Sequence, residues 1–423
     1  MRALLFMLCA AAGLMQGAPA GSIAGTIRDP AGAVIRGATV HVVLAGLGLR
    51  RQTISDGSGE FLLPLLSPGD WTLEVQAASF ETAVINGLRV DVDQTVRVEI
   101  TLRIAGDRQS AEVRAELQPL TGKVVSRDAV VNLPLNGRQY LDLALLAPGV
   151  VPAPAGTQGL GFNSAGSRSQ ANVYLLDGIS NQDTQNNGAL NGFRIGEAIA
   201  EYNVMTSPAL PEFGRGSGAQ VNVVTRSGGQ HWHGAAFEYF RNTSLSAADF
   251  FTNKLGGVKA PLNRNQFGGS LGGPLWQDRT FVFATYEDFR QVAHTVSSTR
   301  VPSLAERATV SDAVARRLLD FWPLPNATGT LDYIADVRNR DYDKTGLIRL
   351  DHRLSERDQL AFRWIEYRGE SLVAGPTPVS GGNTGEPQQR SGMVRWTHAQ
   401  SATWMSEFVL GFSGNRQERA GAL

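Results

Sequence analysis

The sequence predicts a mainly β protein, in which a small N-terminal sandwich is followed by longer, amphipathic strands. Short segments of alternating apolar and polar residues recur through the first hundred residues, separated by Asp-Pro, Asp-Gly and Pro-Gly turn signals. Later segments, such as residues 358–368, keep the alternation over a longer run. No stretch reaches the length of about 18 apolar residues that would indicate a membrane-spanning helix.

The first 20 residues have the features of an export signal. Arg2 is followed by the apolar run Ala3–Met15 and by the small-residue site Ala18-Pro19-Ala20. A buried N-terminal helix is the alternative. The only cysteine, Cys9, lies in this segment. We therefore expect a mature chain that begins near Gly21 and has no thiol.

The composition argues against several functional classes. The chain has 39 basic and 39 acidic residues, whereas a nucleic-acid-binding protein normally carries a basic excess. None of the six histidines stands in an H-E-x-x-H motif, and the glycine-containing stretch Gly161–Arg168 lacks the lysine of a phosphate-binding loop. We expect no nucleic-acid partner, no catalytic residue, no metal and no cofactor.

Residues 21–103 have the strand spacing of a β-sandwich. The Gln94-Thr95 step interrupts the alternation in the last strand pair, which predicts a turn or bulge there. The stretches Gly25–Val40, Ser55–Phe61 and Leu66–Val75 resemble the carboxypeptidase-regulatory-like domain. That resemblance implies a seven-stranded transthyretin/Ig-like sandwich and says little about function.

Residues 104–119 form a polar linker that includes a short segment able to extend. Such a segment can add as a strand to the edge of a partner's sheet, although an ordinary linker is equally compatible with the sequence. The candidate energy-coupling segment consists of Ala111, Glu112, Val113, Arg114 and Ala115.

Residues 120–229 contain several motifs in a fixed order: Leu133–Arg138, Ser164–Arg168, Tyr174–Gly178, Pro211–Ala219 and Val221–Gly229. Together they resemble the plug domain of a TonB-dependent outer-membrane receptor of the Oar-like group. The resemblance implies a mixed α+β plug inside a transmembrane β-barrel of about 22 strands. It also implies an outer-membrane location with lipid contact, an inner-membrane energy-transducing partner of the TonB type, and a bulky solute such as a siderophore, an oligosaccharide or a peptide.

Within the predicted plug, the apolar strand before Asp177 ends in a tight Asp177-Gly178 turn, and an amide-rich loop follows. The amides of that loop are neutral donors and acceptors that suit a polar, carbohydrate-like ligand. A solvated loop without ligand contact is the equally open alternative. The candidate ligand-binding residues are Asn181, Gln182, Asp183, Gln185, Asn186 and Asn187.

Other residues of the predicted plug are candidates for holding or releasing it. Arg168 is expected to pair with carboxylates of the barrel wall, with an acidic ligand as the alternative. The glycine-dense segment near residue 215 is expected to allow tight backbone packing where the plug joins the barrel. The full set of structural or coupling candidates is Arg138, Arg168, Asp177, Gly178, Gly214, Arg215 and Gly216.

Residues 230–423 are predicted to form the first strands of the barrel, beginning with residues 231–242. Leu360, Phe362 and Trp364 share one face, and Trp404, Phe408, Leu410 and Phe412 share another, as the lipid-facing sides of membrane strands do. Leu354–Asp358 is expected to be a short turn, and residues 291–342 a longer outer loop with one helix at Leu304–Phe321. A soluble β-sandwich would alternate in the same way.

About seven strands fit into residues 230–423, far fewer than the resemblance implies. We therefore expect an incomplete barrel, that is, the N-terminal portion of a receptor. The alternatives from other classes are a surface adhesion or matrix β-protein, a carbohydrate-binding exported protein and, least favoured, an exported enzyme with an accessory sandwich.

Overall fold

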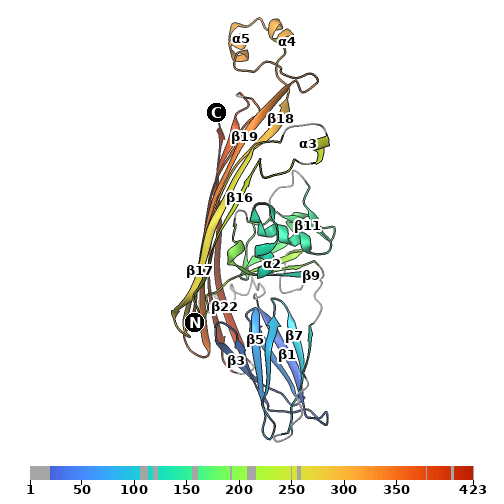
Figure 1. Ribbon diagram of the computed structural model, residues 1–423, viewed down its shortest axis with the longest axis vertical. Helices are drawn as coiled ribbons and strands as arrows, with labels where there is room; N and C mark the ends of the chain where they lie inside the picture. Colours follow the sequence, from blue (N-terminus) through green and yellow to red (C-terminus); the bar gives the residue numbers. More distant parts are fainter. Residues whose placement is uncertain are drawn as a thin grey trace, which may run out of the picture.

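The computed structural model describes residues 20–104, 113–117, 122–154, 161–190, 193–206, 216–248, 250–254, 259–377, 379–401 and 404–422. Figure 1 shows three bodies along the long axis of the molecule: an N-terminal sandwich, a plug domain above it, and a tall sheet of long strands beside both. Among the described residues, no helix is long and apolar enough to cross a membrane.

The sandwich consists of two four-stranded sheets. Its core is made by the inward residues of the alternating strands, among which Ile23, Val40, Trp71 and Leu73 are at most 2% exposed. The first sheet has the order β4 (Glu60–Leu66), β1 (Gly21–Arg28), β7 (Thr95–Thr101) and β8 (Val113–Leu117), and the second has the order β3 (Leu49–Ile54), β2 (Thr39–Leu44), β5 (Gly69–Gln76) and β6 (Ala83–Val90).

Seven strands, β1 to β7, lie within residues 21–103, as the resemblance implied. The expected interruption near Gln94 is a turn between β6 and β7, in which Asp93 adopts a φ of 58°. An eighth strand, β8, comes from the predicted linker and pairs antiparallel with β7, with Ala115 opposite Val98. Part of the linker is therefore an edge strand of the sandwich.

The plug domain is a mixed five-stranded sheet with short helical segments on it, so the expected α+β architecture is observed. Its strand order is β13 (Ile179–Ser180), β12 (Val173–Leu176), β15 (Gln220–Thr225), β14 (Ile199–Met205) and β9 (Gly122–Ser126). The helix α2 (Arg127–Asn132) and the 3-10 turns Asn136–Arg138 and Tyr140–Leu146 pack around it, and β10 (Val150–Pro152) pairs with β11 (Phe162–Ser164). All six residues of β15 are buried.

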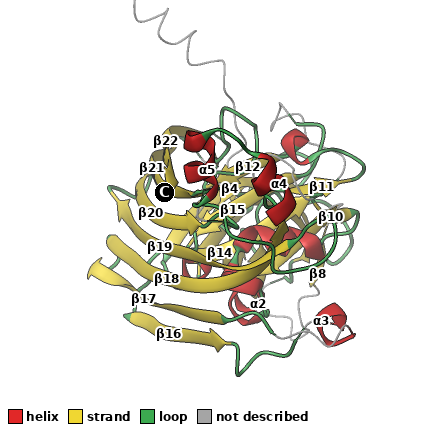
Figure 2. Ribbon diagram, turned by 90° about the horizontal axis from the view of Figure 1, so that it is seen from above, coloured by secondary structure: helices red, strands yellow, loops and turns green. Residues whose placement is uncertain are grey.

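The barrel sheet contains seven antiparallel strands in chain order. Seen from above, the sheet curves around one side of the plug (Figure 2). The strands are β16 (His233–Asn242), β17 (Leu262–Trp276), β18 (Thr280–Thr299), β19 (Tyr333–Arg353), β20 (Asp358–Val373), β21 (Gly382–Ala399) and β22 (Met405–Ala422), and α3 (Phe250–Lys254) lies between β16 and β17.

The two faces of the barrel sheet differ as predicted. On β20, Ala361, Arg363 and Ile365 are buried against the plug, whereas Phe362 on the outer face is 38% exposed. The aromatic residues Trp404, Phe408 and Phe412 are likewise exposed. The plug and the inner face of the sheet share one hydrophobic core, because Phe283, Leu347 and Ile365 cluster with plug residues.

The outer loop is shorter than predicted, and it contains two helices where one was predicted. Strands β18 and β19 pair from Thr280 opposite His352 up to Thr299 opposite Tyr333, so the connection spans only residues 300–332. It holds two short helices, α4 (Leu304–Thr309) and α5 (Ala313–Leu319), in place of one. The break occurs because Asp312 caps a new helix: its carboxylate accepts a hydrogen bond from Ala315 N at 2.7 Å. The predicted turn between Leu354 and Asp358 joins β19 to β20.

Candidate functional site

The Asp177-Gly178 turn lies where the plug meets the barrel sheet. Asp177 and Gly178 have φ values of 50° and 77°, and they join β12 to β13 in the tight turn that the sequence predicted. Glycine accepts this left-handed conformation without steric cost, and aspartate tolerates it better than most residues. The turn directs the Asp177 side chain into the protein, where it is 0% exposed.

Within the plug, Thr225 at the end of β15 fixes the Asp177 carboxylate. The backbone N–H of Thr225 donates to Oδ1 at 2.8 Å, and its hydroxyl donates to Oδ2 at 2.9 Å. Because β12 and β15 are neighbouring parallel strands, the plug sheet itself sets this geometry. Both oxygens of the carboxylate thus accept a hydrogen bond from the plug sheet.

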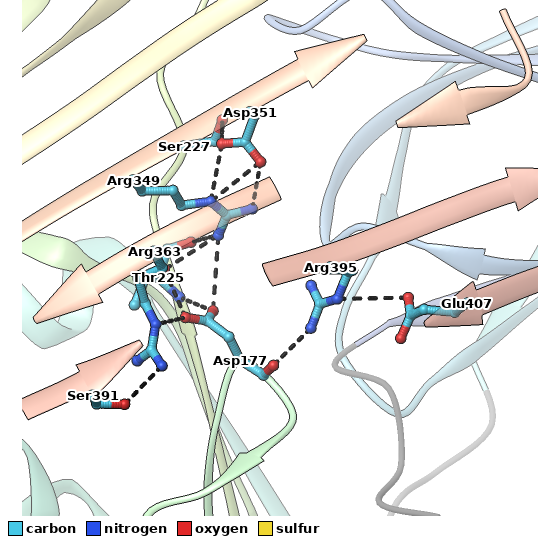
Figure 3. A network of polar contacts seen from close by, with 9 residues as sticks. All are labelled: Asp177, Thr225, Ser227, Arg349, Asp351, Arg363, Ser391, Arg395 and Glu407. Carbon is cyan, nitrogen blue, oxygen red and sulfur yellow. Dashed lines mark hydrogen bonds and ion pairs between the residues drawn. The ribbon is translucent and has the colours of Figure 1, made fainter. Parts of the chain in front are cut away.

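Three barrel strands each bring an arginine to this turn (Figure 3). Nε of Arg363 on β20 is 3.3 Å from Asp177 Oδ2, and Nη1 of Arg349 on β19 is 3.8 Å from Oδ1. Nη2 of Arg395 on β21 donates to the backbone carbonyl of Asp177 at 2.6 Å. The plug turn is thus held by cations from the wall.

Two further carboxylates belong to the same network. Asp351 pairs with Arg349 at 2.9 Å and accepts a hydrogen bond from the plug hydroxyl of Ser227 at 2.7 Å. Glu407 lies 3.6 Å from Nε of Arg395. We call the six charged groups the Asp177 ion cluster: Asp177, Arg349, Asp351, Arg363, Arg395 and Glu407.

Within the cluster, Arg363 depends most on Asp177. Its side chain is 0% exposed, and its one side-chain hydrogen bond to a described residue goes to Ser391 at 2.9 Å. Its Nε and Nη1 atoms are buried without a hydrogen-bond partner in the described structure. A buried ion pair adds little stability compared with apolar side chains of similar volume. Removing one partner, however, destabilises the protein, because it leaves an uncompensated charge in a poorly solvated site. Separating plug and wall therefore requires water to reach these groups.

A second polar contact joins plug and barrel sheet around Arg194. Nε of this plug residue is 3.0 Å from Asp343 on β19, and Asp343 also accepts a hydrogen bond from the Tyr367 hydroxyl on β20 at 2.5 Å. The guanidinium donates to the carbonyl of Gly137 at 2.6 Å and lies 3.7 Å from the ring centroid of Phe289. This contact fixes the predicted Leu133–Arg138 motif against the wall.

Two of the arginines singled out from the sequence, Arg138 and Arg168, have different surroundings. Arg138 is buried; it lies 3.7 Å from Glu197 inside the plug, and its guanidinium is 4.4 Å from the ring centroid of Tyr239 on β16. Arg168 is exposed and makes no ion pair with any described residue. Other residues make the expected wall contacts. At Asp177 the polarity is reversed, because a plug carboxylate faces wall arginines, whereas the plug residue Arg194 pairs with the wall carboxylate of Asp343 in the expected sense.

The amide-rich loop is only partly available to a ligand. Asn181 is buried and donates to the Tyr140 hydroxyl at 3.2 Å, while Gln182 donates to the carbonyl of Asn172 at 2.9 Å. The side chains of Asp183 and Asn186 accept hydrogen bonds from nearby loop N–H groups. Gln185 and Asn187 are exposed, and Asn187 donates to the carbonyl of Gln170 at 2.6 Å. The side chains of five of the six predicted ligand-binding residues, all except Gln185, thus already make hydrogen bonds that shape the loop.

The remaining candidates fall partly outside the described residues. Gly214, Arg215, Ala111 and Glu112 lie outside them. A Cβ on Gly216 would come within 2.5 Å of Val173 Cγ2 and 2.7 Å of the Ala171 carbonyl, so this position needs glycine for close packing. Val113, Arg114 and Ala115 lie in β8, on the edge of the sandwich.

The sandwich contacts the plug through its β6–β7 turn. Glu201 of β14 is buried and accepts a hydrogen bond from the Val92 N–H at 2.7 Å. Asn203 donates to the Val92 carbonyl at 3.2 Å, and Asn222 donates to the Asp93 carboxylate at 3.2 Å. Arg89 lies 3.7 Å from Glu201.

Burial and the nearby Asp91 raise the pKa of Glu201 from an ordinary 4.5 to about 8, against the opposing effects of the Val92 N–H and Arg89. The folded state thus favours the protonated acid. The contribution of Glu201 to the free energy of unfolding is fully present below about pH 4.5, declines as pH rises, and is lost above about pH 8.

Sequence reasoning missed Arg349, Arg363, Arg395 and Glu407 as members of a site. The available signal was their position on the inward face of alternating strands, where an arginine among apolar neighbours is unusual. The sequence does not reveal which plug group they meet. Among the described residues, no group of three or more His, Cys, Asp or Glu side chains could hold a metal ion.

Comparison with known proteins gives consistent matches along most of the chain. Residues 22–103 match the carboxypeptidase regulatory-like domain, and residues 224–313 and 308–422 match an outer membrane beta barrel domain. The TonB-dependent transporter Oar of Myxococcus xanthus is 28% identical over 375 residues, which cover 82% of this chain and 34% of the relative. The outer membrane transporter YddB from Escherichia coli has a similar fold, with a TM-score of 0.50 at 14% identity over 69% of this chain and 38% of that structure.

Proposed function

The chain is homologous to the TonB-dependent transporters of the outer membrane, and from this premise we propose that it takes part in the energy-coupled uptake of a bulky polar solute. Its outer-membrane location and its mainly β architecture agree with the predictions from the sequence. It spans 34% of the length of the Oar transporter, so the activity itself is a proposal.

The observation that carries this proposal is the Asp177 ion cluster. A plug that must stay closed at rest and open under force needs a contact that is specific yet can be separated. Charged and hydrogen-bonded groups regain hydration when they separate, whereas a purely apolar interface would gain nothing from water. Ser227 and Thr225 belong to the plug, and Arg349 and Asp351 belong to the wall, so the cluster crosses the boundary that has to open.

In the proposed cycle, a TonB-type partner in the inner membrane pulls on the chain between the sandwich and the plug. Residues Ala111–Ala115 remain our candidate for the coupling segment. Strand β8 in this region pairs with β7, so a partner would have to replace one set of backbone hydrogen bonds by another. Such an exchange preserves the number of hydrogen bonds and needs little net free energy. Force then separates the ion cluster, and no covalent chemistry is involved.

The solute would be polar, because the exposed amides Gln185 and Asn187 are neutral donors and acceptors. A siderophore, an oligosaccharide and a peptide all carry matching groups. The residues that make hydrogen bonds within the loop would set the shape of the loop, and the exposed side chains of Gln185 and Asn187 would contact the solute.

Maleimide labelling of a buried plug cysteine tests the proposal. Val221 is 1% exposed in the plug sheet, and Val221→Cys introduces a thiol into a mature chain expected to have none. In cells that carry the TonB-type partner, we expect faster labelling in energised cells than in uncoupler-treated cells. Ile100→Cys, in the sandwich core, is the matched control and should show no such difference. Equal labelling of Val221→Cys in both states would contradict the proposal.

A disulfide across the sandwich edge tests the coupling segment separately. Val98 and Ala115 are opposite each other in the β7–β8 ladder, so V98C/A115C should form a disulfide. We expect the oxidised protein to bind the purified periplasmic domain of a TonB-type protein weakly, and the reduced protein to bind it normally. Equal binding in both states would place the coupling segment elsewhere.

A further inference from the structure

A basic cavity of about 770 Å³ lies between the sandwich and the hairpin end of the barrel sheet. The sandwich side is formed by the edge strand β3 and its neighbour β2, with His41 and Arg50 on one face of the sheet and Arg51 on the other. The barrel side is formed by the turns that precede β18 and β20, with Arg279, Arg353 and Arg357. The cavity volume is in the range of small-molecule sites.

Three of the five arginines in the cavity have no protein partner for their charge. The guanidinium groups of Arg50, Arg51 and Arg357 make no hydrogen bond or ion pair with a described residue. Nη1 of Arg51 is moreover buried and without a hydrogen-bond partner in the described structure. An unsatisfied buried donor costs about 1–3 kcal/mol, and more when it is charged.

The other two arginines are engaged, but neither is neutralised. Arg353 donates to the backbone carbonyls of Gly48 and Asp278. Arg279 stacks on the ring of Trp276, with its Cζ 4.9 Å from the ring centroid. These contacts fix the two guanidinium groups in position and leave their charge uncompensated.

Carboxylates in the cavity are too few to balance the arginines. The lining contains two acidic residues, Asp278 and Glu356, against five arginines. Asp278 already accepts a hydrogen bond from Gln230 at 2.8 Å. Several cations therefore lie near one another with partial screening, which is unfavourable unless an anion occupies the space between them.

We propose that this cavity binds an anion that bears phosphate groups and thereby ties the sandwich to the barrel. A guanidinium presents a rigid fork of donors that matches phosphate oxygens, and one phosphate can accept forks from several directions. A planar carboxylate is satisfied by one fork, so five arginines from the sandwich strand β3 and two turns of the barrel sheet favour phosphate. The volume exceeds the need of a single ion, which indicates a ligand with more than one phosphate or with an organic body.

The bridging position gives the ligand a mechanical effect. Arg50 and Arg51 belong to the sandwich, whereas Arg279, Arg353 and Arg357 belong to the barrel sheet. An anion bound to both sets opposes separation of the two bodies. This inference does not depend on transport, and its test uses no solute.

The test is isothermal titration of the full chain in detergent micelles with pyrophosphate, with citrate, and with nanodiscs that contain or lack phosphatidylglycerol, at about 0.15 M salt. We expect saturable binding of pyrophosphate, or of phosphatidylglycerol if the natural source is a lipid headgroup. R51Q/R357Q should weaken that binding by about tenfold or more, because it removes two charged donors. R51K/R357K, which keeps the charge but not the fork, should give an intermediate affinity.

The control is R97Q/R338Q, which removes two exposed arginines, one on the sandwich strand β7 and one on the barrel strand β19, outside the cavity lining. It should bind like the parent chain. Tighter binding of citrate than of both phosphate probes would overturn the assignment to phosphate. Absence of binding, or equal losses in R51Q/R357Q and the control, would overturn the site itself.

Discussion

Replacing Asp177 by Asn removes one negative charge from the ion cluster and keeps the shape of the side chain. The amide oxygen can still accept the hydrogen bond from the Thr225 N–H, which is 2.8 Å long in the parent protein. Arg363, whose side chain is 0% exposed, then has no carboxylate within reach among the described residues. The variant therefore tests the ionic contact rather than the turn.

The expected magnitude follows from what each arginine retains. Arg349 keeps Asp351 at 2.9 Å and Arg395 keeps Glu407 at 3.6 Å, so both remain compensated. Arg363 keeps only Ser391 at 2.9 Å. Breaking one buried pair from one side costs about 3–5 kcal/mol. Every 1.4 kcal/mol is about a tenfold change in an equilibrium, so the released state should become about two to three and a half orders of magnitude more populated.

The assay is maleimide labelling of Val221→Cys in the purified full chain in detergent micelles. When opening and closing are fast compared with labelling, the labelling rate follows the population of the open state. We expect D177N to accelerate labelling by at least about a hundredfold. D128N, which removes an exposed plug carboxylate, is the matched control and should label at the parent rate.

A double variant separates charge imbalance from other effects. D177N/R363Q removes both partners, so no charge is stranded, and we expect slower labelling than with D177N alone. R363Q alone completes the comparison. If D177N labels at the parent rate, the cluster does not hold the plug. The same conclusion follows if the free-energy change of D177N/R363Q, calculated from its labelling rate, equals the sum of the changes of D177N and R363Q.

Three further predictions concern other contacts. The free energy of unfolding, measured by denaturant titration, should decline as pH rises from about 4.5 to about 8 through the titration of Glu201, and E201Q should abolish this part of the pH dependence because an amide does not ionise. Gly216→Ala should lower the free energy of unfolding, measured by denaturant titration, by about 1–3 kcal/mol, because the new Cβ would lie 2.7 Å from the backbone carbonyl of Ala171. Gly57→Ala is the control and should change this free energy little, because its Cβ would have no atom within 4 Å. Tyr367→Phe should destabilise the protein by about 1–3 kcal/mol in denaturant titrations, because Asp343 loses a 2.5 Å hydrogen bond; a change below the error of the titration would refute a role for this hydroxyl.

Much of the fold could be predicted because it depends on local pattern. Alternation along each strand identified the outer face of β20 at Phe362 and the inner face at Arg363. The Asp177-Gly178 pair identified a tight turn, since few residues tolerate positive φ. The outer loop was predicted to be longer than it is. Strands β18 and β19 extend into the predicted loop because their backbones remain paired up to Thr299 and Tyr333, and the side-chain pattern at these exposed positions does not indicate that pairing.

The candidate site could be predicted only in part. Asp177 was identified through its turn, but its partners Arg349, Arg363 and Arg395 lie on three strands more than 170 residues away in the sequence. Arg168 was a reasonable choice for a wall contact from its motif, yet its side chain is exposed. Pairing across such distances is decided by which strands are neighbours in space.

The sequence by itself determined the β class, the order of the domains and the orientation of each strand's faces, because those follow from periodicity and from turn residues that act over a few positions. Only the tertiary structure decided which charges meet: the Asp177 carboxylate with the wall arginines, β8 with the sandwich edge, and five arginines around one cavity. The physical reason is that the burial and neighbours of an ionisable group, which set its energy, arise from contacts between distant segments that no local pattern specifies.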